Sequence, residues 1–465
     1  MNALTTDFYE FTMSCGCLEQ FSAERKAAFE LFFRRVPQGG GYAIAAGGAY
    51  AAKQIASLRF TDEDICWLRT LGRFDEAYLS RLQSFVPSCD IDMVPEGTPV
   101  FPYEPILTVS GPAWEAQFLE TLLLLTVNHQ SLIATKAARI CRAAQGRPVI
   151  EMGARRAHGA DAAILGARSA YLGGAAATTC TRAAQQYSIP PAGTMAHSWV
   201  QMFDSEYAAF RAFAKQFPER CTFLVDTYDV LSSGIPNVIR VADEILRPRG
   251  YSPYAVRLDS GDLLPLSHKV RRLLDAAGYP RTKIMVSGSM DEHSIRSLLD
   301  AGAPIDIFGV GERLITARDE PVFGGVYKLC AIRDTHWIPR MKFSEDAGKQ
   351  TIPHRKTVYR LYAPSGEPIA DVLTLCGETV YPPYTARTLH GKSVCLTGFS
   401  AAPLLRPLLR RGRAVPLPSL LEGRTLCRRQ LNLLPERFTR TDSPAPYPVL
   451  LSSALYELRC SMNGN

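Results

Sequence analysis

The sequence lacks any apolar stretch long enough to cross a membrane. Its longest strongly apolar run, residues 118–127, is about half of the roughly 20 residues that a membrane-spanning helix needs. The first residues, MNALTTDFYEF, also lack the basic start and apolar core of a secretory signal. We therefore expect a cytoplasmic protein with no membrane partner.

Paired cysteine motifs are absent as well. The 12 cysteines are scattered along the chain, only Cys15 and Cys17 lie close together, and there is no C-x-x-C pair. This spacing argues against a zinc ribbon and against a disulfide framework. We expect reduced thiols that serve mostly as small core residues.

A large excess of one charge is also missing. The 52 lysines and arginines against 45 acidic residues give a net charge of +7, which suits anionic small molecules but is too small for a nucleic-acid surface. Nine arginines gather in residues 406–440, but aromatic residues are not interleaved with them. We expect a solvated or subunit-facing surface there, and no nucleic-acid partner.

The length and the pattern of the chain predict more than one domain. At 465 residues the chain is too long for one ordinary core. Residues 1–110 alternate strand-like pieces with glycine and proline turns, which is typical of a small α+β domain. Residues 112–142 have a helical pattern. The segment 331–465, with a β-rich stretch at 342–378, is expected to return to the N-terminal domain and to cap the domain between them.

The middle of the chain, residues 111–330, follows a repeating plan. Short apolar strands each lead into a polar or glycine-rich turn and then into a helix, at a spacing of about 20 to 30 residues. Counting weaker candidates near Ala175 and Ala192 gives about seven such units. This predicts an α/β fold with an irregular, TIM-like parallel barrel. The strands are PVIEM, CTFLVDTY, YAVRLDS, KIMVSGS and IDIFGVG.

Loops after the carboxyl ends of such strands gather at one rim, where several polar residues would converge. A single aspartate in this position is often just a helix cap, but aspartate or arginine at three separate strand ends indicates a site. The converging residues are Arg155, Thr194, His197, Asp226, Asp229, Arg257, Asp259, Asp262 and the glycine turn 309–311.

Three short motifs suggest the chemistry of this rim. FGVGERLI places glycines directly after a strand, where free backbone N–H groups attract a phosphate, although a tight turn alone would need them too. VRLDSGDL sets Arg257 beside an oxygen-rich turn that can hold Mg²⁺ or ribose hydroxyls. In LVDTYD, either Asp226 or Asp229 could accept the ring N–H of His197. Together they indicate a phosphorylated sugar as ligand.

Nearly the whole chain resembles nicotinate phosphoribosyltransferases. The resemblance is carried by ten segments in the family's order: LTTDFYEFTM, FFRRVPQGGGYAIAAGG, QSLIATKAARI, GARRAHGADAAILGARSAYLGG, IPPAGTMAHSWV, LVDTYDVL, VRLDSGDL, IDIFGVGERLIT, FGGVYKL and YPVLLSSALYEL. The resemblance implies a type II phosphoribosyltransferase that works as a homodimer in NAD salvage. Nicotinate, phosphoribosyl pyrophosphate and ATP would give nicotinate mononucleotide, pyrophosphate, ADP and phosphate.

The resemblance also implies roles for individual residues. His197 matches the transiently phosphorylated histidine, Asp226 an acidic position beside it, and Asp259 one at the ribose and Mg²⁺ site. Tyr9, entering from the partner subunit, and Thr194 match nicotinate-site positions. The remaining substrate-binding positions are Arg155, Thr179, Arg257, Ser260, Gly309, Gly311 and Glu312.

Thr179 is the residue that favours nicotinate over nicotinamide. Relatives that take the amide carry an aspartate there, and an aspartate facing the carboxylate of nicotinate would be strongly repelled. Three residues depart from the family pattern: Glu312 in place of threonine, Met152 in place of a stacking aromatic, and Cys180 in place of asparagine. The alternatives are a nicotinamide phosphoribosyltransferase and a catalytically idle relative that only binds ligands.

Overall fold

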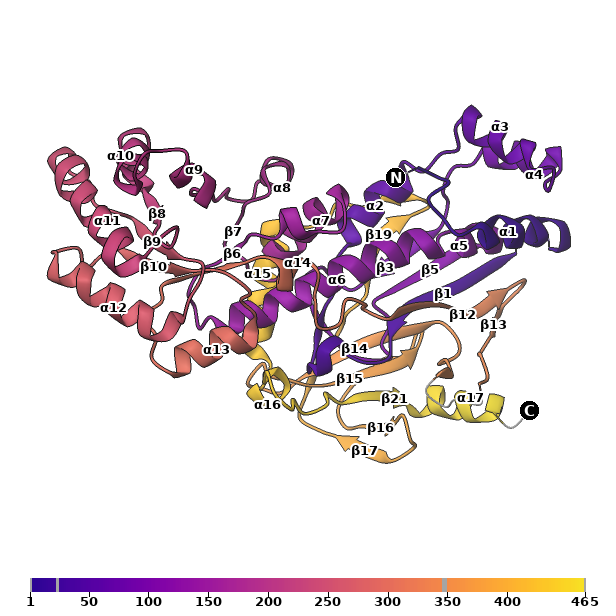
Figure 1. Cartoon of the computed structure of the whole chain (residues 1–465). Coiled ribbons are helices and arrows are strands. Elements are labelled where there is room, and N and C mark those ends of the chain that lie inside the picture. Colours follow the sequence, from indigo (N-terminus) through magenta and orange to yellow (C-terminus); the bar gives the residue numbers. More distant parts are fainter. Residues whose placement is uncertain (1, 22–24, 345–348, 464–465) are drawn as a thin grey trace. The chain divides into compact units, whose positions relative to one another are not determined.

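The computed structural model describes residues 2–21, 25–344 and 349–463. The chain divides into two compact units, one comprising Met1–Leu132 with Val322–Asn465 and the other comprising Ile133–Pro321 (Figure 1). The helical pattern at 112–142 corresponds to α5 (Ala113–Phe118) and α6 (Glu120–Ala143). No helix in the described ranges is apolar enough over a sufficient length to span a lipid bilayer.

The Ile133–Pro321 unit is built on a six-stranded parallel sheet in the order β7-β6-β11-β10-β9-β8. Its strands are short apolar runs, and β8 and β11 are buried along their whole length, as expected where both faces of a parallel sheet are covered. The bounds are β6 Val149–Glu151, β7 Ala177–Thr178, β8 Thr222–Leu224, β9 Ala255–Leu258, β10 Lys283–Val286 and β11 Ile307–Val310.

Helices follow these strands, as the repeating plan predicts. In α12, the buried residues Ser267, Val270 and Leu274 lie on one face of the helix. Helix α13 begins after Asp291, whose side chain accepts from the backbone N–H of Ser294 in a capping box. Figure 1 shows α11, α12 and α13 beside strands β8, β9 and β10. The bounds are α7 Ala160–Leu172, α8 Thr181–Tyr187, α9 His197–Gln201, α10 Glu206–Gln216, α11 Ile235–Val241, α12 Leu263–Ala276, α13 Glu292–Asp300 and α14 Glu312–Ile315.

The parallel α/β sheet is confirmed, whereas a closed barrel of about seven strands is not. The candidate strand near Ala175 is β7, but the candidate near Ala192 contributes only an isolated bridge between Thr178 and Pro191 within the described residues. Pro190 and Pro191 have no backbone N–H to donate, so this segment makes a single bridge instead of a strand.

In the other unit, segments from both ends of the chain share one antiparallel sheet. Strand β1 pairs with β5 on one side and with β12 on the other. The order is β13-β12-β1-β5-β3-β19-β20, and β2 pairs separately with β4. The bounds are β1 Lys26–Phe33, β2 Ala43–Ile44, β3 Asp90–Met93, β4 Pro99–Val100, β5 Leu107–Pro112, β12 Gly325–Arg333, β13 Trp337–Pro339, β19 Arg406–Arg410 and β20 Arg413–Ala414.

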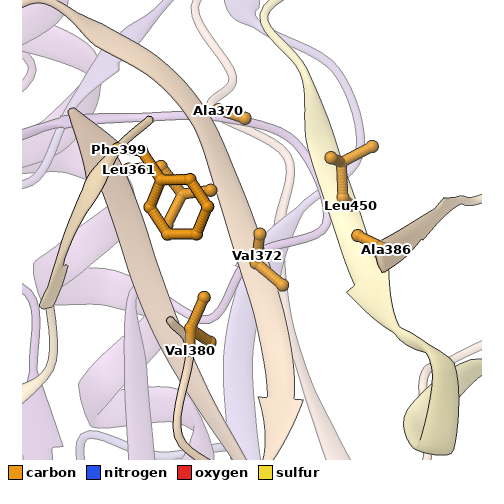
Figure 2. Packing of buried hydrophobic residues seen from close by; sticks show 7 residues of the cluster. All are labelled: Leu361, Ala370, Val372, Val380, Ala386, Phe399 and Leu450. Atoms are coloured by element: carbon orange, nitrogen blue, oxygen red, sulfur yellow. The ribbon is translucent and has the colours of Figure 1, made fainter. Parts of the chain in front are cut away.

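A second, mixed sheet of this unit has the order β17-β16-β21-β15-β14-β18. Figure 2 shows Leu361, Val372 and Phe399 in its apolar cluster. The predicted β-rich stretch contains β14 and β15, while its residues 345–348 lie outside the described ones. The bounds are β14 Lys356–Tyr362, β15 Pro368–Leu375, β16 Tyr384–Thr388, β17 Ser393–Leu396, β18 Ser400–Pro403, β21 Val449–Ser452, α1 Phe8–Gln20, α2 Gly48–Ala56, α3 Asp62–Thr70, α4 Glu76–Gln83, α15 Leu420–Leu433, α16 Glu436–Thr439 and α17 Ser453–Asn463.

A buried ion pair joins β14 to β15. The Arg360 guanidinium donates through Nε and Nη2 to the two oxygens of Asp371, at 2.9 and 2.7 Å, and both side chains are at most 2% exposed. Tyr447 also donates to Asp371, and Arg360 donates to the Pro99 carbonyl oxygen. These hydrogen bonds offset the free-energy cost of removing the two charges from water.

We expect Asp371→Asn to lower the free energy of unfolding by about 3–5 kcal/mol, because it removes the carboxylate that pairs with a buried guanidinium. Urea denaturation followed by circular dichroism measures the change. The control is Glu76→Gln, which breaks the exposed Arg69–Glu76 pair and should leave the urea midpoint almost unchanged. Equal midpoints for Asp371→Asn and the parent chain would contradict this account of the pair.

Candidate active site

Polar side chains line the carboxyl-terminal edge of the parallel sheet. Because the strands run in one direction, their carboxyl ends lie at one edge, and the strand order places the ends of β8, β9, β10 and β11 next to one another. The residues directly beyond these ends include Asp226, Asp259, Ser287 and Gly311. Three of these positions were predicted from the sequence, and Ser287 was not.

His197 is the first residue of the short helix α9. Its Nδ1 lies 3.1 Å from the Thr227 hydroxyl oxygen, and its Nε2 lies 3.9 Å from Oδ1 of Asp226. The imidazole is 41% exposed, whereas the Asp226 side chain is only 3% exposed. One ring nitrogen therefore faces a buried carboxylate while the ring stays open to a ligand.

Asp226 connects two strand ends. Its Oδ2 accepts from the Asp259 backbone N–H at 3.0 Å and from the Ser260 hydroxyl at 2.6 Å. Its Oδ1 is buried and accepts no hydrogen bond from the described residues. A buried carboxylate oxygen without a donor is unfavourable, so this oxygen is suited to a protonated imidazole or a metal ion.

Asp229, the other candidate partner of His197, caps a helical turn. Its Oδ1 accepts from the backbone N–H groups of Leu231 and Ser232 and from the Ser232 hydroxyl. The bonds from Ser232 hold the pKa of the Asp229 carboxyl below its usual value. The structure therefore favours Asp226 as the histidine's partner and gives Asp229 the ordinary capping role.

Arg257, Asp259 and Ser287 form a second cluster across β9 and β10. Arg257 donates from Nε to the Ser287 hydroxyl and from Nη2 to Oδ1 of Asp259, each at 2.8 Å. The Ser287 hydroxyl also donates to Asp259 Oδ1. Burial alone would raise the pKa of Asp259, but the Ser287 hydrogen bond and the Arg257 charge outweigh it and lower the pKa. Asp259 is thus held as a carboxylate beside a fixed guanidinium.

Two carboxylates at this edge are suited to a magnesium ion that also takes substrate oxygens as ligands. Within the described ranges no three His, Cys, Asp or Glu side chains are grouped to form a metal cage. Mg²⁺ typically takes one or two carboxylates and completes its shell with water and substrate phosphates. The unpartnered Oδ1 of Asp226 and the ionised Asp259 are donors of that kind.

The predicted glycine turn 309–311 begins inside β11 and ends directly beyond it, and it packs tightly against the end of β6. A Cβ at Gly309 would lie 2.7 Å from Met152 Sδ and 3.1 Å from Ser287 Cβ, so a larger residue would displace both neighbours. Gly311, directly before α14, lies against the Met152 carbonyl oxygen, which a Cβ would approach to 3.2 Å. Close packing thus accounts for both glycines, and the binding of a phosphate to the backbone N–H groups of this segment stays a prediction.

Glu312 is compensated by two arginines. Its carboxylate lies 4.0 Å from Arg156 Nε and 3.3 Å from Arg318 Nη1. The negative charge that would repel a phosphate here is therefore offset locally. Arg155, the predicted phosphate contact, is exposed in the same short turn as Arg156.

Thr179 follows β7. The buried Glu151, at the end of β6, joins the ends of these two strands. The Thr179 backbone N–H donates to the Glu151 carbonyl oxygen at 2.9 Å, and the Glu151 carboxylate accepts from Gly153 N–H and from the Thr178 hydroxyl. Burial raises the pKa of Glu151 despite these bonds. Sequence reasoning missed Glu151, although its place at a strand end, in PVIEM, was a usable signal.

Thr179, Thr194 and Tyr9 form no hydrogen bond with His197, Asp226 or Asp259 in the described part of the chain. The Thr179 side chain is half-buried, and the Thr194 hydroxyl donates to the neighbouring Met195 carbonyl oxygen at 3.3 Å. Tyr9 belongs to α1 of the other unit and is 43% exposed. Burial and the nearby acidic residues raise its pKa to about 12. Cys180, one of the departures, is packed with Ala167 and Ala183.

Comparisons with known proteins give the family of the chain. Three family models match in sequence order: the nicotinate phosphoribosyltransferase N-terminal domain at residues 4–128, the nicotinate phosphoribosyltransferase family at 148–333, and its C-terminal domain at 355–459. Nicotinate phosphoribosyltransferase of Bacillus subtilis is 40% identical over 97% of this chain and 93% of its own length.

Two further relatives extend the comparison. A Mycobacterium tuberculosis nicotinate phosphoribosyltransferase is 41% identical over 98% of this chain and 92% of its own length. The crystal structure of human nicotinic acid phosphoribosyltransferase superposes with a TM-score of 0.88 at 33% identity, covering 98% of this chain and 99% of that one. The chain therefore belongs to the nicotinate phosphoribosyltransferase family.

Proposed function

We propose that the chain transfers the phosphoribosyl group of phosphoribosyl pyrophosphate to nicotinate, forming nicotinate mononucleotide in NAD salvage, and that ATP drives the transfer through a phosphohistidine at His197. The observation that carries the proposal is the placement of the His197 ring between the Thr227 hydroxyl and the unpartnered Oδ1 of Asp226. Family membership supports the reaction, and this geometry supports the coupling.

The surroundings of His197 favour one nitrogen as nucleophile. With Asp226 accepting from Nε2, the ring keeps its proton on that side, and a small rotation shortens the 3.9 Å contact to a hydrogen bond. The lone pair then resides on Nδ1, which accepts from Thr227 until a phosphoryl group arrives. As Nδ1 forms a bond to the γ-phosphorus of ATP, the bond from that phosphorus to the β–γ bridging oxygen breaks and ADP leaves. The ring becomes positive, and Asp226 stabilises that charge. Water later hydrolyses the N–P bond and releases phosphate.

Arg257 and Asp259 are suited to the glycosyl transfer. As pyrophosphate leaves, positive charge develops on the ribose ring and negative charge on the leaving group. The fixed Arg257 guanidinium is available to an anionic group, and the Asp259 carboxylate to the ribose hydroxyls or to a metal. Mg²⁺, when bound, would neutralise pyrophosphate charge. Ser260 and Asp226 keep the turn that carries Asp259 in place.

The phosphate and pyridine groups are both assigned to the part of the sheet edge formed by β7, β6 and β11. The 5′-phosphate would meet the Gly309–Gly311 turn and Arg155, with Glu312 already offset by Arg156 and Arg318. Nicotinate would lie near Thr179 and Thr194. We propose a homodimer in which Tyr9 of the partner subunit covers the pyridine ring, an arrangement consistent with the exposed Tyr9 side chain.

We expect His197→Ala to abolish the stimulation of nicotinate mononucleotide formation by ATP, because the variant lacks the ring nitrogen that accepts the phosphoryl group. Nicotinate mononucleotide formation is measured with Mg²⁺ and phosphoribosyl pyrophosphate, with and without ATP.

Asp226→Asn should lower the ATP-coupled rate by about 10- to 100-fold, since it removes the acceptor that orients the ring. The matched control is Asp229→Asn, which leaves the ring untouched. Equal rates with and without ATP in the parent enzyme would contradict the role given to His197.

We expect Thr179→Asp to lower kcat/KM for nicotinate by about 100-fold or more, because like charges facing each other cost several kcal/mol. The same change should improve the relative use of nicotinamide, whose amide can donate to the new carboxylate. Thr179→Asn, of similar size but neutral, is the control and should keep the preference for nicotinate. A parent enzyme that prefers nicotinamide would overturn the substrate assignment.

A further inference from the structure

The arginine-rich segment of residues 406–440 contributes to a groove in the unit of β19 and β20, which does not contain His197. The groove has a volume of about 550 Å³, within the usual range for ligand sites. Arg59, Arg411 and Arg413 line it, and its lining includes no acidic residue. The remaining lining residues are Ala56, Val86, Pro87, Ser88, Gly412 and Ala414.

The three arginines carry unbalanced charge. All three are exposed, and none forms an ion pair with any residue in the described ranges. Arg59 donates to the carbonyl oxygens of Leu58 and Ala56, which orients its guanidinium without neutralising it. Like charges collected in one concave surface favour a bound counter-ion.

The acidic residues nearby form hydrogen bonds or ion pairs that do not involve the three guanidiniums of the groove. Asp92 pairs with Arg410, which is outside the groove lining. Asp90 accepts from the backbone N–H of Arg411, and Glu115 accepts from Ser88. None of these carboxylates is paired with the three guanidiniums of the groove, so their charge remains for a ligand.

The chain holds two of the arginines on a rigid turn. Arg410 is paired with Arg413 in the β19–β20 hairpin, so Arg411 and Gly412 are its two central residues, and both have positive φ, at 48° and 70°. A Cβ at Gly412 would lie 1.8 Å from the Pro87 carbonyl oxygen, so only glycine allows this approach. The Gly412 N–H also donates to the Cys89 carbonyl oxygen.

We propose that this groove is a second anion site, separate from the one at His197, and that it binds a diphosphate group. Three guanidiniums with free N–H donors match the several negative charges and many acceptor oxygens of a diphosphate better than they match a single carboxylate. The apolar wall of Ala56, Val86 and Pro87 leaves room for an organic group attached to it.

Isothermal titration of the full chain with inorganic pyrophosphate tests the proposal. The double variant Arg59→Ala, Arg413→Ala should weaken one class of site by about tenfold for each guanidinium removed. The matched control, Arg428→Ala with Arg429→Ala, makes the same change in charge on α15 outside the groove lining and should bind like the parent. The charge reversal Arg413→Glu provides an independent single variant.

The isotherms of the groove variants and the control decide between the possible sites. A binding class that is lost in both groove variants and kept in the control supports it, and any binding that survives belongs to another site. Identical isotherms for the parent and the groove variants, or no pyrophosphate binding by the parent, would overturn it. Titration of the parent and the groove variants with ADP identifies the source of the diphosphate. For the class of binding that the groove variants lose, ADP binding at least as tight as that of pyrophosphate makes a nucleotide the occupant, and weaker binding makes it inorganic. Because only this class is compared, and its arginines have no part in the proposed catalytic site, the result is independent of the proposed catalytic function.

Discussion

The candidate site depends on the buried carboxylate of Asp226. One of its oxygens binds the backbone of Asp259 and the hydroxyl of Ser260, which fixes the turn after β9 to the end of β8. The other oxygen faces His197 without a donor of its own among the described residues. The same side chain thus fixes the position of a second acid and sets the electrostatic surroundings of the imidazole, so a change there would disturb both the turn after β9 and the imidazole.

Charge balance explains how two carboxylates can lie so close at this edge. Asp259 is compensated by Arg257 and Ser287 through hydrogen bonds to one oxygen, and its pKa falls although burial opposes ionisation. Asp226 instead receives neutral donors on one oxygen only. The two carboxylates therefore differ in their surroundings. Asp259 is ionised and accepts hydrogen bonds from Arg257 and Ser287, whereas Asp226 keeps one oxygen that can stabilise a positive charge developing nearby.

Much of the fold followed from local patterns, because strand and helix periodicity act over a few residues. The strands around Phe223, Ala255 and Ile284 were predictable from short apolar runs between turns, and so was their parallel arrangement. The number of strands was not, because Pro190 and Pro191 reduced one expected strand to a bridge. Closure of a sheet depends on pairing between distant segments, which a local pattern does not encode.

The contrast between local patterns and contacts of distant segments also explains which site residues were predictable from the sequence. Its strand-end residues were predictable because a parallel sheet gathers carboxyl ends at one edge, and that rule would also have found Ser287 and Glu151 had every strand end been considered. The effect of Glu312 was harder to foresee, since Arg156 lies far from it in the sequence and compensates its charge only in the folded chain. A glycine turn that offers backbone N–H groups can tolerate such a substitution, because the donors do not belong to the side chain that changed. Under the proposed function, a departure from the family motif therefore matters least where the backbone supplies the contact, and most at His197, whose ring nitrogen is the proposed reacting atom.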